Sequence, residues 1–196
     1  MAKQAGRRGE ITDVLLRIAA TRGLDHVSVR EVAGAAGVSI GAVQHYFATK
    51  DEMLVFAFRQ VAERTRARVA GLDARTGPRA ALAAALRELL PLDEARLAEC
   101  RVYVAFAARA ATSPVLAAVQ RETLAAIHAE LRQVLSAVPG PRRGPRPDPE
   151  VEARLLLAVT DGLVFDAVSA PGTFTRADLE TALDTYLDRL FPGDRD

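Results

Sequence analysis

The stretch Ser28–Glu52, SVREVAGAAGVSIGAVQHYFATKDE, decides the fold of this chain. It opens with a capping box, Ser28-x-x-Glu31, and the apolar residues that follow recur at helical spacing. Gly37 occupies the position where a left-handed helix end requires glycine, and Ser39 can then cap a second short helix. The pattern predicts two short helices joined by a tight turn. Such a helix-turn-helix can place its second helix in the major groove of DNA.

Residues on both sides of this stretch extend the pattern. In chain order they are Arg8-Gly9-Glu10-Ile11, Gly23-Leu24, Ser28-Val29-Arg30-Glu31-Val32-Ala33, Ala36-Gly37-Val38-Ser39, Gly41, Tyr46-Phe47, Lys50 and Met53-Leu54. Together, and at this spacing, they resemble the N-terminal DNA-binding domain of the TetR family of bacterial transcription regulators. Beyond this first part of the chain, the all-helical pattern agrees, with a fainter similarity to the C-terminal half of BetI-like members.

Apolar periodicity predicts an all-α chain of about nine helices, without a convincing alternating strand pattern. The expected ranges are about 7–21, 29–36, 40–47, 50–72, 78–90, 94–111, 114–138, 149–169 and 176–190. We place a helix-turn-helix domain over 1–50, with its motif at 28–47, and a C-terminal helical ligand-binding and dimerisation domain over 51–196. The proline-rich segment 139–149, PGPRRGPRPDP, is predicted to be an exposed extended linker. Its arginines could touch nucleic acid or simply solvate a loop.

Composition and charge narrow the function classes. The net charge of the chain is only +1, but residues 1–50 hold seven lysines and arginines against four acids, as binding to a phosphate backbone requires. One cysteine allows no intramolecular disulfide and no cysteine-based zinc site. The absence of a long apolar run and of a signal sequence predicts a cytoplasmic protein. No nucleophile with a base, metal cluster or phosphate-binding loop is evident, so we expect neither an enzyme nor a cofactor.

The helix-turn-helix reading assigns DNA contacts to individual residues. Ile40 could touch a thymine methyl and Gln44 could pair with adenine, while Gly41 permits close approach. The resemblance supports these roles, although the family often has Tyr at the position of Gln44. The remaining candidates are suited to phosphate contacts: Ser28, Arg30, Ser39, His45, Tyr46 and Lys50. As alternatives, the serines could serve only as caps, Ile40 could be packing, and His45 could be an ordinary surface histidine.

Specific binding normally needs two copies of this motif, spaced by a two-fold dimer. The apolar faces of the last two helices are the natural interface, with Leu155, Leu156, Val159, Leu163, Leu179, Leu183, Tyr186, Leu187 and Leu190. These residues could instead complete the core of one chain. The family resemblance favours the dimer.

The resemblance also implies a small-molecule site among the C-terminal helices, where ligand binding shifts the DNA-binding heads apart. The candidate lining is Cys100, Tyr103, Phe106, His128, Asp161 and Phe165. A carboxylate within the apolar run around Asp161 costs free energy unless it is paired or used. It could orient a cationic or hydroxyl-bearing ligand, or form a salt bridge with Arg132 or Arg154, which is the favoured reading.

The sequence therefore predicts a homodimeric repressor that binds a palindromic operator in double-stranded DNA and releases it on binding an unidentified small molecule. The alternative is a ligand-independent DNA-binding protein or a helical protein-interaction module. The response of DNA affinity to small molecules distinguishes these two readings.

Overall fold

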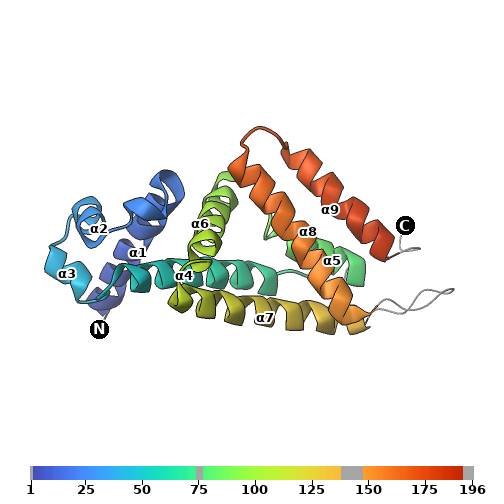
Figure 1. Ribbon diagram of the computed structural model, residues 1–196, viewed down its shortest axis with the longest axis horizontal. Helices are drawn as coiled ribbons and strands as arrows, with labels where there is room; N and C mark the ends of the chain where they lie inside the picture. The colour runs from blue at the N-terminus through green and yellow to red at the C-terminus, as the bar shows by residue number, and fades with distance from the viewer. Residues whose placement is uncertain (1, 74–76, 138–147, 192–196) are drawn as a thin grey trace. The chain divides into compact units, whose positions relative to one another are not determined.

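The computed structural model describes residues 2–73, 77–137 and 148–191, and all regular structure in these ranges is helical (Figure 1). The elements are α1 (Ala2–Arg22), the 3-10 helix η1 (Leu24–His26), α2 (Val29–Ala36), α3 (Ile40–Gln44), α4 (Lys50–Ala70), α5 (Pro78–Arg87), α6 (Glu94–Ala110), α7 (Pro114–Ala137), α8 (Pro149–Ser169) and α9 (Arg176–Leu190). The prediction of an all-α chain with about nine helices is confirmed for this part of the chain. The predicted linker at 139–149 lies outside the described residues, except for its last two.

Three helix ends lie about three or more residues from the predicted ones. α1 begins at Ala2, earlier than expected, because the preceding residues include good helix formers and no proline. α3 ends at Gln44 and α5 at Arg87, each about three residues before the predicted end, because the backbone hydrogen bonds tighten into turns there. Pro91 contributes to the second case, since the residue before a proline is disfavoured in the helical region.

Polar side chains cap the starts of several helices. Asp93 accepts a hydrogen bond from the backbone N–H of Arg96 at the start of α6, at 2.8 Å. α9 begins with a complete capping box, in which Thr175 and Asp178 each accept a bond from the other's backbone N–H. These short polar patterns set the starts of the helices, because they satisfy amide groups that have no partner within the helix.

The described chain forms two compact units, and each is considered by itself. The first consists of Met1–Arg64 and Leu97–Gln120. Its buried apolar side chains form one cluster, to which α1, α2, α3, α4 and α6 contribute. The ring of Phe58 on α4 stacks on that of Phe106 on α6, with centroids 4.1 Å apart. The first three helices therefore share their core with α4 and α6.

The second unit consists of Thr65–Arg96 and Arg121–Asp196. Here α8 and α9 form a packed pair joined by a short turn, seen in orange and red in Figure 1. Gly172 lies in that turn with φ of 89°, a conformation that side chains other than glycine rarely adopt. None of the described helices combines the length and the apolar character needed to cross a membrane.

Ion pairs connect α5 to α9 within the second unit. Arg79 pairs with Asp188, and Arg87 pairs with Asp184 at 2.6 Å. All four side chains are between about one fifth and one third exposed. Pairs of this kind orient one helix against another while most of the packing free energy comes from the apolar side chains below them.

Candidate nucleic-acid interface

Local hydrogen bonds build the helix-turn-helix. The Ser28 hydroxyl accepts the backbone N–H of Glu31 at 3.2 Å, which starts α2. Gly37 ends α2 with φ of 64°, in the left-handed region where glycine is favoured. The Ser39 hydroxyl then accepts the backbone N–H of Ala42 at 3.1 Å and starts α3. The sharp change of direction between the two helices therefore follows from three residues that the sequence places at the right spacing.

Packing fixes which face of α3 is presented to solvent. Val43 on α3, Val32 on α2 and Phe47 in the following turn are buried in the first unit's core. On the opposite side, Ile40 is 45% exposed and Gln44 is exposed. Ile40 is consequently not a core residue of this chain, and an apolar side chain on this face is available to a base edge.

The predicted backbone-contacting residues are all accessible. Arg30, Ser39 and His45 are exposed, and the others are half-buried: Ser28, Tyr46 and Lys50. Gly41, predicted to permit close approach, is also exposed. The His45 and Tyr46 rings meet edge to face with centroids 5.2 Å apart. The fold therefore places all nine predicted residues in the first unit, between Ser28 and Lys50, without burying any of them completely.

Lys50 is held in place by a contact that the sequence does not reveal. Its Nζ donates to the backbone carbonyl of Asp25 at 3.1 Å, across 25 residues of chain. This bond occupies one of its three donors and leaves the others for an anion. The ammonium group is therefore positioned at the first residue of α4.

Two backbone amides around the start of α4 are bonded within the chain. Glu52 N–H donates to the Thr49 hydroxyl at 3.1 Å, and the Glu52 carboxylate accepts the N–H of Ala48 at 2.8 Å. Thr49 and Glu52 thus form a shifted capping box, in which the carboxylate accepts the N–H of the residue before the cap residue. Because Glu52 also places a negative charge in this turn, a phosphate here would depend on the Lys50 side chain more than on the helix dipole.

Sequence reasoning missed one ion pair that joins α1 to α2. Arg22 Nη1 lies 2.6 Å from Glu31 Oε2, and both side chains are nearly half exposed. The sequence had suggested that Glu31 completes the first capping box; its carboxylate instead pairs with Arg22. No local pattern relates these two residues, because Gly23 and η1 separate them.

The predicted ligand-lining residues divide between the two units. Cys100, Tyr103 and Phe106 lie in the first unit, where the Phe106 ring is fully buried against Phe58. Tyr103 also lies near Phe58, with ring centroids 6.2 Å apart. Both rings therefore pack in or against the core of the first unit.

The other three predicted ligand residues are on α7 and α8 in the second unit. His128 and Asp161 are half-buried, whereas Phe165 is 56% exposed. The two arginines expected to pair with Asp161 both reach Glu150, Arg132 at 3.6 Å and Arg154 at 2.9 Å. No group of three or more metal-binding side chains occurs among the described residues.

The predicted interface residues on α8 and α9 also fall into two groups. Leu156, Leu179, Leu183 and Leu187 are buried within the single chain and complete the second unit's own core. By contrast, Leu155 is 48% exposed, and the remainder are half-buried: Val159, Leu163, Tyr186 and Leu190. A side chain that is already buried offers no area to a partner. The sequence pattern could not separate the two groups, because the same helical spacing serves both.

The fold and the exposed α3 face define a helix-turn-helix DNA-binding protein. Residues 11–55 match the model of the bacterial regulatory proteins of the tetR family. Residues 78–192 match the C-terminal domain of BetI-type transcriptional repressors. The chain therefore belongs to the TetR family of transcription regulators and carries a BetI-type C-terminal domain. This family is non-enzymatic, in agreement with the expectation from the sequence.

Individual relatives cover nearly the whole chain. The transcriptional regulator BetI of Burkholderia cenocepacia is 30% identical over 96% of this chain and 95% of its own. The crystal structure of a transcriptional regulator from Rhodococcus sp. Rha1 is 45% identical, with a TM-score of 0.86, covering 94% of this chain and 96% of its own. The multidrug binding protein EbrR, in complex with ethidium, is 31% identical, with a TM-score of 0.69, covering 94% and 98%.

Proposed function

We propose that this regulator is a homodimeric repressor that binds a palindromic operator and releases it when a small molecule binds among its C-terminal helices. The observation that carries the proposal is the exposed face of α3, where Ile40, Gly41 and Gln44 are free to approach bases. Lys50, fixed by the Asp25 carbonyl, adds a positioned charge beside them. Base readout and phosphate anchoring are the two contributions that a specific DNA interface needs.

An exposed stripe on α8 supports the dimer. Val151, Leu155 and Phe165 are each about half exposed, and they recur at the spacing of one helical face together with the exposed Ala158 and Gly162. Exposed apolar side chains in a row typically mark a protein interface. We propose that two copies of the chain meet along this stripe, so that each contributes one α3 to a two-fold operator.

The effector proposal rests on similarity. The relative EbrR is described as a multidrug binding protein and forms a complex with ethidium. We propose that the BetI-type domain of this chain likewise accepts a small organic molecule. Such a molecule changes operator occupancy only through the difference in its affinity for the DNA-bound and DNA-free forms. If no compound in a broad panel alters DNA affinity, the ligand-independent reading is favoured.

The first test is fluorescence anisotropy with DNA from immediately upstream of the protein's own gene, near physiological salt, with excess random duplex as competitor. We expect saturable binding that survives competition and is lost in the double variant Gln44→Ala, Lys50→Ala. The matched control is Arg132→Ala, Gln133→Ala, which removes the same kinds of side chain from the exposed face of α7 and should bind like the wild type. Competitor-sensitive binding at this and at every genomically selected site would contradict specific regulation.

A further inference from the structure

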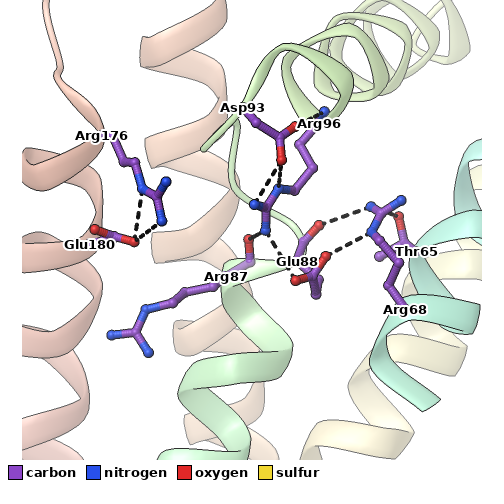
Figure 2. Close-up of polar contacts among 8 residues, drawn as sticks. All are labelled: Thr65, Arg68, Arg87, Glu88, Asp93, Arg96, Arg176 and Glu180. Carbon is purple, nitrogen blue, oxygen red and sulfur yellow. Dashed lines mark hydrogen bonds and ion pairs between the residues drawn. The ribbon is translucent and has the colours of Figure 1, made fainter. Parts of the chain in front are cut away.

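A cluster of charged side chains in the second unit joins three segments of the chain (Figure 2). Glu88, just after α5, lies at its centre. Its Oε2 accepts from Arg68 Nε on α4 at 2.7 Å, and its Oε1 accepts from Arg96 Nη1 on α6 at 3.1 Å. The Glu88 and Arg96 side chains are each only 17% exposed. One carboxylate therefore bridges two guanidinium groups that come from two different helices.

Further bonds make the cluster stiffer than a single pair. Arg96 also donates to the backbone carbonyl of Arg87 at the end of α5, at 3.3 Å, and pairs with Asp93 at 2.9 Å. Arg68 donates to the Glu88 carbonyl and to the Thr65 hydroxyl, both at 3.4 Å. Figure 2 shows both arginines converging on Glu88. Because each arginine is already ordered by one bond, the next costs less side-chain entropy.

The cluster lies next to two of the points at which the chain passes between the two units. The chain passes from the first unit to the second within α4, between Arg64 and Thr65, and returns at the start of α6, between Arg96 and Leu97. The cluster ties these two passages to each other, since Arg68 and Arg96 share one carboxylate. α4 begins at Lys50, a predicted phosphate-contacting residue, and its last turn carries Arg68.

We propose that Glu88 is a positioning residue for DNA binding: by clamping the last turns of α4 to α5 and α6, it sets the separation of the two α3 helices in the dimer. This inference rests on the proposed function. Lys50 and Arg68 lie about 27 Å apart along α4 at 1.5 Å per residue. A tilt of about 5° at the clamp thus displaces Lys50 by roughly 2 Å, which is a large part of one base-pair step of about 3.4 Å.

The test uses operators with altered spacing between the half-sites. A palindromic duplex is first selected from random sequence by the wild-type protein, and one or two base pairs are then inserted or removed at its centre. Dissociation constants are measured for the wild type, Glu88→Gln, Arg68→Met and the double variant. The spacing penalty is the ratio of the dissociation constant for a wrong spacing to that for the selected spacing. We expect this ratio to be about fivefold smaller, or smaller still, in Glu88→Gln than in the wild type. A fivefold change is at the lower end of typical coupling between distant sites. Affinity for the selected spacing should fall.

Two comparisons separate positioning from stability. Asp188→Asn breaks a partly buried ion pair between α5 and α9, outside the cluster around Glu88, so it should leave the spacing penalty at the wild-type value. Arg68→Met keeps the Glu88–Arg96 pair but releases α4, and should reproduce the effect of Glu88→Gln. The double variant should add nothing further, because both substitutions remove the same link. If Glu88→Gln does not fold, Arg68→Met carries the test.

The outcomes are distinguishable. A wild type that selects a palindrome with a defined spacing, together with variants whose penalty is unchanged, overturns the positioning role alone. A wild type that selects no palindrome, or tolerates every spacing equally, overturns the proposed dimeric repressor and this inference with it.

Discussion

Asp93 shows how much one carboxylate can do at the start of a helix. It accepts the backbone N–H of Arg96 at 2.8 Å and the Nε of the same residue at 3.0 Å. The backbone hydrogen bond from Arg96 lowers the pKa of Asp93 below its ordinary value, and the guanidinium adds to this effect, while partial burial opposes it. The ionised carboxylate is therefore favoured in the folded state, which links this residue to the pH dependence of stability.

The sign of that dependence follows from the lowered pKa. Asp93 stabilises the fold at a pH above its unfolded-state pKa of about 3.9, and this contribution is lost as the pH falls through the lower folded-state pKa. Asp93→Asn keeps the capping shape but removes the charge. In urea unfolding we expect the wild type to be more stable at pH 6, with the difference narrowing steadily in acid. A difference that is the same at pH 6 and at pH 3 would contradict this origin.

At the scale of elements, the Phe58–Phe106 stack is a buried contact between α4 and α6 in the first unit. Phe106 is completely buried, so Phe106→Ala leaves a cavity and should lower the free energy of unfolding by about 3–5 kcal/mol. Chemical denaturation monitored by helical circular dichroism measures this change. Val134→Ala, on the exposed face of α7, is the control and should change stability by less than about 0.5 kcal/mol. Equal effects of the two variants would contradict the packing described for Phe106.

The elements that the sequence predicts well are those that depend on local chemistry. Ser28, Gly37 and Ser39 determine the helix-turn-helix within a dozen residues, and the structure follows their pattern. The contacts of Lys50 with the Asp25 carbonyl and of Arg68 with Glu88 are different. They join segments that are distant in the sequence, and their proximity depends on how whole helices pack. Helical periodicity shows which face of a helix is apolar, but not which other helix packs against it.

The same distinction explains why the sequence predicted the apolar faces of α8 and α9 but not which of their residues are buried within the chain. Periodicity predicted that both helices have apolar faces, which is correct, but it could not assign each leucine to a side. Leu156 is buried in the core of its own chain, and Leu155, one position earlier and about 100° around the helix, is half exposed. Only the packed structure shows that one surface of α8 is used within the chain and another is left uncovered.

At the scale of the whole molecule, the uncovered surface of α8 predicts the assembly. Leu155→Glu should convert the proposed dimer to a monomer, because a carboxylate cannot be buried in an apolar interface without a partner. Operator affinity should then fall roughly 100-fold or more, the loss expected when two linked sites act separately.

Sedimentation velocity measures whether the Leu155→Glu variant is a monomer, and fluorescence anisotropy measures its operator affinity. Val115→Glu is the matched control, since Val115 is also apolar and 61% exposed but lies on α7. It should leave both the mass and the affinity unchanged. A dimeric Leu155→Glu variant with normal operator affinity would show that the dimer interface does not include this surface of α8.

The shared core of the first unit limits how this regulator can be recombined with others. α4 buries Phe58 against Phe106 of α6, which belongs to the later segment of the first unit, residues 97–120. Val102 and Leu116 of the same segment also contribute to this core. A chimera that joins residues 1–64 to the C-terminal domain of another regulator would therefore replace part of the first unit's core with side chains of the other protein. Such a chimera has to include residues 97–120 as well. The part of the chain that can be exchanged as a folded DNA-binding unit is therefore encoded by two separate segments of the gene.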